Sequence, residues 1–122
     1  MYGTIDILSF CRILTDLTNK DKCEWRPTSH KSRDRLDFKT GYIEITQYQK
    51  SDKRNKFYHI ELFNDDDSQF IPFEAEKDKE IDSEAYIVFG NLYKAIWNYY
   101  IRTRNEKIGS FFNEIMEVSS KN

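Results

Sequence analysis

The chain has 122 residues, the usual size of one domain and enough to bury a single hydrophobic core. A hydrophobic fraction of 39% and an aromatic fraction of 16% argue against disorder, while a charged fraction of 33% and a mean hydropathy of −0.79 predict a well solvated surface. The first residues show neither a basic stretch nor an uninterrupted apolar run. We therefore expect one globular domain over residues 1–122, cytoplasmic and without a membrane partner.

The net charge of −2 conceals an uneven distribution of charge along the chain. Residues 20–56 carry 11 basic and 6 acidic side chains, whereas residues 57–90 carry 2 basic and 10 acidic ones. The two cysteines, Cys11 and Cys23, fit no metal-binding or redox spacing. We expect them to be buried free thiols, and we expect neither a metal nor a cofactor.

The first part of the chain predicts one helix and one short strand. Apolar residues recur at helical spacing before residue 19, with Thr4 or Asp6 available as the N-cap: Ile7, Phe10, Cys11, Leu14 and Leu17. From residue 22 the period changes to two, because Cys23 and Trp25 alternate with charged neighbours. Pro27 then ends this strand, since it has no N–H to donate. We expect Trp25 in the core, paired across the sheet with Leu36 or Ile43.

Three further strands are predicted by alternating apolar and polar residues. Residues 36–38 and 43–45 alternate on either side of Gly41, a pattern that favours a hairpin with a tight turn. The polar residues 49–55 then form a connection. The alternation resumes over residues 57–63, which predicts the fourth strand.

A fifth strand is expected over residues 69–73, after a turn of Asn, Asp and Ser over residues 64–68. Pro72 marks this strand as an edge. The acidic residues 74–82 are typical of a solvated linker. Because strands joined by short connections are usually antiparallel neighbours, we expect a five-strand meander.

Two helices are expected after the sheet. Residues 83–104 carry apolar side chains on more than one helical face, so this aromatic helix is either wrapped by the domain or awaits a partner. A last apolar stripe over residues 108–118 predicts a separate helix after a break near Asn105 or Gly109, which both weaken a continuous helix. One helix reaching Val118 is the alternative. The fold class we expect is α+β: an N-terminal helix, a five-strand antiparallel meander and two C-terminal helices packed on one face.

A meander places successive connections at alternate ends of the sheet. Lys31 and Arg33 would then lie with Lys53 and Arg54 at a basic end, and the aspartates 65–67 at the opposite end. Basic side chains beside exposed aromatic rings are typical of proteins that bind phosphate backbones and stack bases. The four basic residues are therefore candidates for anion or nucleic-acid binding. The rings that could stack bases are Phe57, His59 and Phe63.

No catalytic motif is present. His30 and His59 have no nucleophile beside them in sequence, although a Cys–His pair could still form in the fold. The aspartate run departs from an EF-hand loop, because Phe70 stands where that loop needs glycine. Phosphate-binding, dinucleotide and zinc motifs are also missing from the sequence. We expect no enzyme and assign no catalytic or metal-binding residue.

Several short features resemble those of a loose group of small uncharacterised bacterial or phage-borne proteins. The group shares a leading helix that ends in LT, a Cys or Lys followed by Trp on the first strand, a meander, and a C-terminal helix that contains LY. The matching residues, which are spread over most of the chain, are Leu17, Thr18, Cys23, Trp25, residues 58–63, Leu92 and Tyr93. The resemblance implies the α+β fold and brings no activity with it.

Two functions from different classes are open. The first is a non-enzymatic interaction or regulatory protein that binds a protein partner, or a second copy of itself as a dimer, through the aromatic helix. Tyrosine and tryptophan are enriched at interface hot spots, so Tyr93, Trp97 and Tyr100 are the expected interface residues. The alternative is a nucleic-acid-associated protein that uses the basic end of the sheet.

Overall fold

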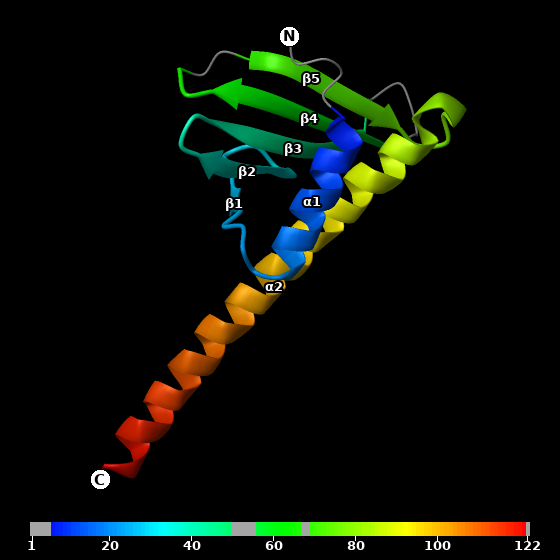
Figure 1. Ribbon diagram of the computed structural model, residues 1–122. Coiled ribbons are helices and arrows are strands. Elements are labelled where there is room, and N and C mark those ends of the chain that lie inside the picture. Colours follow the sequence, from blue (N-terminus) through cyan, green and yellow to red (C-terminus); the bar gives the residue numbers. More distant parts are fainter. Residues whose placement is uncertain (1–5, 50–55, 67–68, 122) are drawn as a thin grey trace.

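The computed structural model describes residues 6–49, 56–66 and 69–121, and arranges them as a helix, a five-stranded sheet and a long second helix (Figure 1). The elements in chain order are α1 (Ile7–Asn19), β1 (Arg26–Pro27), β2 (Arg33–Phe38), β3 (Gly41–Gln49), β4 (Lys56–Asn64), β5 (Gln69–Glu76), the 3₁₀ turn η1 (Glu80–Asp82) and α2 (Ser83–Ser120). The predicted α+β class, with a leading helix and five antiparallel strands, is confirmed. In these described segments, neither helix has the length and apolar character needed to cross a lipid bilayer.

The sheet is the predicted meander. Its strands are ordered β1-β2-β3-β4-β5, and each pairs antiparallel with the next. Pro72 lies on the edge strand β5, as expected for a residue that cannot donate to a further strand. The register Leu36–Ile43–Leu62 places apolar side chains on the face that packs against the helices. The buried core joins α1, the sheet and α2 through Cys11, Leu14, Leu36, Ile43, Ile45, Ile60, Val88, Leu92 and Ile96.

The first strand begins later than predicted, and the segment between α1 and β1 closes the core without strand pairing. Cys23 and Trp25 are buried as expected, but β1 begins only at Arg26. The indole Nε1 of Trp25 donates a 2.9 Å hydrogen bond to Oγ1 of Thr18, whose hydroxyl donates at 2.7 Å to the Leu14 carbonyl. A buried indole N–H needs an acceptor, so Trp25 is directed to α1 and does not pair across the sheet.

Gly41 is required for a reason that the sequence did not show. It begins β3 with an ordinary negative φ, so a left-handed turn does not explain the glycine. A Cβ at this position would lie only 2.1 Å from the carbonyl oxygen of Phe63 in β4. The backbones of β3 and β4 therefore approach too closely here for any side chain.

The first half of α2 packs on the sheet around one tyrosine ring. The centroid of the Tyr58 ring in β4 lies 4.9 Å from that of Tyr86 and 5.6 Å from that of Tyr93. Gly90 lies between these two residues on the helix, and a Cβ there would be 3.3 Å from the Tyr58 ring. The Tyr58 hydroxyl accepts a 3.1 Å hydrogen bond from Nε2 of Gln47. These contacts fix the position of α2 over β4.

The helix α2 is continuous, so the predicted break near Asn105 or Gly109 and the separate third helix are wrong. Asparagine or glycine inside a helix costs at most about 1 kcal/mol relative to alanine. Ending one helix and nucleating another is also unfavourable, because the first turn fixes several residues for a single hydrogen bond. Local propensity at two positions is therefore too weak to divide this helix.

The predicted linker over residues 74–82 is also wrong in part. Its first residues extend β5 to Glu76, and its last ones form η1. A carboxylate oxygen of Asp82 accepts a 3.0 Å hydrogen bond from the backbone N–H of Glu76. The start of α2 is thus tied directly to the end of the sheet.

Candidate interaction site

The second half of α2 leaves the rest of the protein after Arg102. The guanidinium of Arg102 donates to Oδ1 of Asp21 at 2.8 Å and to the carbonyl of Thr18 at 3.1 Å, at the end of α1. Figure 1 shows the helix continuing away from α1 and the sheet beyond this point. Residues 104–120 extend the helix by about 26 Å at 1.5 Å per residue. Nearly all of them are exposed.

Tyr100 forms the other anchor of α2 near this exit point. Its hydroxyl donates a 2.7 Å hydrogen bond to Oδ1 of Asp34, a β2 residue that is only 6% exposed. Burial raises the pKa of Asp34, and the hydrogen bond from Tyr100 offsets part of this rise. Burial, followed by the neighbouring carboxylate, raises the pKa of Tyr100. Each of the two groups therefore keeps its proton to a higher pH than it would in water.

The exposed apolar side chains of α2 follow a heptad pattern. Alternating steps of three and four residues connect Ile101, Arg104, Ile108, Phe111, Ile115 and Val118, and Trp97 continues the pattern one step toward the sheet. We term these residues the α2 seam. Its apolar side chains are between 41% and 65% exposed, and each of the three isoleucines occupies the first apolar position of a heptad. Phe112 and Met116 lie beside the seam and are also exposed.

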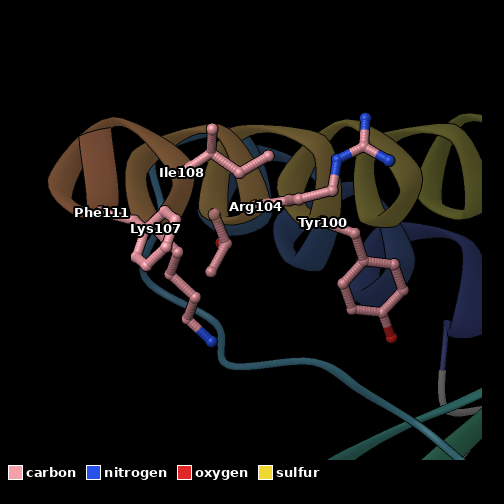
Figure 2. A pocket seen from close by; sticks show the side chains of 6 residues that line it. Tyr100, Arg104, Lys107, Ile108 and Phe111 are labelled. Carbon is pink, nitrogen blue, oxygen red and sulfur yellow. The ribbon is translucent and has the colours of Figure 1, made fainter. Parts of the chain in front are cut away.

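Part of the seam borders an open hollow of about 440 Å³. The residues that line it are Tyr100, Thr103, Arg104, Lys107, Ile108 and Phe111, all of which belong to α2. Figure 2 shows Arg104 and Ile108 toward one edge of this face of the helix, and Tyr100, Lys107 and Phe111 toward the other edge. A chain lying along α2 here would contact both sets of side chains. The described part of this chain supplies no opposite wall to the hollow.

The three expected interface residues differ in their surroundings. Tyr93 is buried against the Tyr58 ring. Tyr100 is half-buried and bonded to Asp34. Trp97 is 52% exposed, and its ring lies edge-on to that of Tyr93 at 6.4 Å between centroids. Of the three, Trp97 offers the largest free surface to another molecule.

The basic end of the sheet is described only in part. Lys31 is exposed, whereas Arg33 is half-buried and its Nε donates a 3.0 Å hydrogen bond to Oγ1 of Thr46. Lys53 and Arg54 fall outside the described residues. The connection that contains them leaves β3 at the end where Arg33 pairs with Thr46, whereas the turn after Asn64 lies at the Gly41 end. Of the aspartates, residues 65 and 66 lie in that turn and residue 67 is not described.

The sheet face opposite the helices carries carboxylates beside its aromatic rings. Nε2 of His59 lies 2.7 Å from Oε1 of Glu61, and its Nδ1 lies 3.4 Å from Oε2 of Glu74. Tyr48 donates a hydrogen bond to the same Glu74 carboxylate. Phe57 is only 2% exposed and cannot stack on a base. Arg33 and Arg35 lie on the same face, with the Arg35 guanidinium 3.5 Å from the centre of the Tyr42 ring, so this face carries charges of both signs.

Groups suited to nucleophilic or metal chemistry are poorly placed. Cys11 and Cys23 are free and buried, and burial raises the pKa of the Cys11 thiol to about 12. The reactive form of cysteine is the thiolate, so neither sulfur is an activated nucleophile at neutral pH. Over residues 6–49, 56–66 and 69–121, no three His, Cys, Asp or Glu side chains are grouped to hold a metal ion.

Comparison with known proteins yields no match among family models, curated proteins or solved structures. The resemblance to small bacterial or phage-borne proteins therefore stays an expectation. The site is defined by its geometry alone.

The seam was missed in the sequence because the helix was expected to break inside it. Its residues were divided between an aromatic helix and a separate stripe over residues 108–118. The regular steps from Ile101 to Val118 pass through both Asn105 and Gly109 without interruption. That continuity is the signal that could have predicted one helix with one exposed seam.

Proposed function

We propose that this chain is a protein-interaction module without enzymatic activity, which binds another protein chain along the α2 seam. The observation that carries the proposal is the seam itself: apolar side chains that are 41% to 65% exposed, in heptad order, on a helix that projects from the domain. A monomer rarely exposes an apolar strip of this kind, which Arg104 interrupts at one position, and such strips mark interaction surfaces. A second helix laid along the seam would remove these side chains from water.

The lack of packing along the projecting segment supports the same conclusion. Most helix stability in proteins comes from packing an amphipathic face and not from intrinsic propensity. Residues 104–120 make no hydrogen bond to another described element, and they include the helix-weakening Gly109. A bound chain would supply the packing that this segment lacks.

The test compares association by two matched double variants with that of the wild type. Ile108→Glu with Ile115→Glu places two charges in the seam, whereas Ser110→Glu with Asn113→Glu places two charges on the opposite face of α2. We expect the seam variant to abolish association, both with itself by light scattering and with proteins captured from a cell extract. The control variant, Ser110→Glu with Asn113→Glu, should retain both self-association and the captured proteins. Equal behaviour of all three proteins in both assays would refute the proposal.

A further inference from the structure

We infer that the occupant of the α2 seam is a second copy of this chain, whose α2 lies antiparallel to the first over residues 101–118. The inference rests on the proposed function, because it names the partner of the same surface. In parallel coiled coils, β-branched side chains at the first apolar position of the heptad favour two strands, so this pattern indicates a pair of helices and leaves their direction to other residues. The seam has isoleucine there three times, at Ile101, Ile108 and Ile115.

A single register satisfies the whole seam. When Ile108 lies opposite Phe111 of the second copy, Ile101 lies opposite Val118 and Ile115 lies opposite Arg104. The arrangement has a two-fold axis between the helices, so each contact occurs twice. The apolar seam residues from Ile101 to Val118 are all covered in this register, and Trp97 lies just outside it on the side of the sheet.

Arg104 distinguishes the two possible directions of pairing. In a parallel, in-register pair, Arg104 would face its own copy, which brings two like charges together inside the seam. In the antiparallel pair it faces Ile115, where its methylene groups can pack while the guanidinium reaches solvent. The seam sequence therefore favours the antiparallel direction.

Charge complementarity beside the seam supports the same register. Lys107 occupies the heptad position that precedes Ile108, and Glu114 occupies the equivalent position before Ile115. In the antiparallel register Lys107 faces Glu114 of the second copy, and the two-fold axis repeats the pair. Neither side chain has an ion-pair partner elsewhere in the described chain. In a parallel pair Lys107 would instead face Phe112.

The position of the domain is compatible with this pairing. The sheet and α1 lie at the Ile101 end of the seam, and the free end of α2 extends away from them (Figure 1). Antiparallel pairing places the two domains at opposite ends of the paired helices. Each domain then lies beside the C-terminal turns of the other copy's α2.

Charge reversal tests the register in the full chain by sedimentation equilibrium. Lys107→Glu and Glu114→Lys each place like charges opposite one another twice, and each should raise the dimer dissociation constant about tenfold. The double variant Lys107→Glu with Glu114→Lys restores opposite charges and should return the dissociation constant to near the wild-type value. Glu117→Lys, on the opposite face of α2, is the control and should have little effect.

A cysteine cross-link provides an independent readout of direction. A mixture of Ile108→Cys and Phe111→Cys chains should form disulfide-linked dimers with one chain of each kind, because these positions face each other only in the antiparallel register. Ile108→Cys alone should not cross-link, whereas a parallel pair would link it efficiently. The natural cysteines are buried and do not compete.

The outcomes separate this inference from the proposed function. A wild-type monomer that still captures a different protein through the seam would overturn the inference and leave the proposed function standing. A dimer without rescue by the double charge variant, or with cross-linking of Ile108→Cys alone, would overturn the antiparallel register. Rescue together with the mixed cross-link would establish it.

Discussion

The hydroxyl of Tyr100 in α2 donates a 2.7 Å hydrogen bond to the buried carboxyl group of Asp34 in β2. This contact joins two residues that are 66 positions apart in the sequence, and it lies two positions before Arg102 in α2. With the bonds of Arg102 to Asp21 and Thr18, it sets the direction in which the rest of the helix projects. These polar contacts add to the apolar packing of α2 on α1 and β4 in holding the helix where the seam begins.

The first prediction concerns the pH dependence of Asp34. Burial raises its pKa in the folded protein, so the unfolded chain releases this proton at a lower pH than the folded chain does. As pH rises above about 3.9, Asp34 therefore lowers the free energy of unfolding until its folded-state pKa is passed. Asp34→Asn retains an acceptor for Tyr100 without a charge. The free energy of unfolding of this variant, minus that of the wild type, should be larger at pH 7 than at pH 4.

Urea denaturation at several pH values measures this difference. Tyr100→Phe is the companion variant, because it leaves Asp34 buried without its donor and should destabilise by about 1 to 3 kcal/mol at pH 7. The prediction is contradicted if the free energy of unfolding of Asp34→Asn, minus that of the wild type, becomes smaller as pH rises. That result would show that folding stabilises the charged carboxylate.

The second prediction concerns the buried hydrogen bond between Trp25 and Thr18. Thr18→Val conserves shape but leaves the indole N–H without an acceptor, so it should destabilise by about 1 to 3 kcal/mol. Trp25→Phe removes the donor and costs packing as well. The double variant leaves neither group unpaired, so its loss should be smaller than the sum of the two single losses by about 0.5 kcal/mol or more. Additive losses in thermal unfolding would show that the bond contributes nothing specific.

The sheet could be predicted from the sequence because its signals are local. Residues 36–38 and 43–45 alternate in a period of two and flank a glycine, and the structure pairs Leu36 with Ile43 as that pattern requires. Connections of a few residues then leave the meander as the simplest topology. The edge position of Pro72 follows from its missing N–H.

The remaining features depend on contacts between distant elements. Trp25 alternates with charged neighbours as a strand residue would, but its acceptor is Thr18 on α1, which no local period reveals. The glycine at position 41 is explained by Phe63 in a different strand. The surplus of aromatic residues on residues 83–104 indicates Trp97 as an interface residue, and the structure leaves it 52% exposed, but an assumed break at Asn105 or Gly109 divides the seam from Ile101 to Val118. The low helix propensity of Asn105 and Gly109 is a local signal, and the continuous helix through both positions shows that it does not decide the structure here.

The third prediction concerns the two thiols. Burial raises the pKa of Cys11 to about 12 and also raises that of Cys23, so the native protein holds almost no thiolate at pH 8. We expect a thiol reagent to modify neither residue in the native state and both residues in denaturant. The raised pKa of Cys11 also lowers the stability of the fold as pH rises from about 8.5 toward 12, because the unfolded thiol ionises first. Rapid modification of one native thiol at pH 8 would contradict its burial.

The fourth prediction concerns Gly41. Gly41→Ala would place a methyl group against the Phe63 carbonyl oxygen, which belongs to the backbone and cannot move without displacing β4. We expect a loss of about 1 to 3 kcal/mol in the free energy of unfolding, which is the usual cost of overpacking. Denaturant titration provides the measurement. A neutral or stabilising effect would mean that β3 and β4 separate easily at this end of the sheet.

The last prediction compares two glycines of the same helix. Gly109 has no atom within 4 Å of a Cβ built at its position, whereas a Cβ on Gly90 would meet the Tyr58 ring at 3.3 Å. Replacing either by alanine brings the same gain in helix propensity, about 1 kcal/mol. Gly109→Ala should therefore stabilise the projecting segment, and hydrogen exchange over residues 104–120 should slow by up to about fivefold.

Gly90→Ala should show a smaller gain or a loss in the free energy of unfolding, because the Tyr58 ring must shift. Equal effects of the two substitutions would indicate that α2 does not pack closely on Tyr58, and that the first half of the helix is as free as the second.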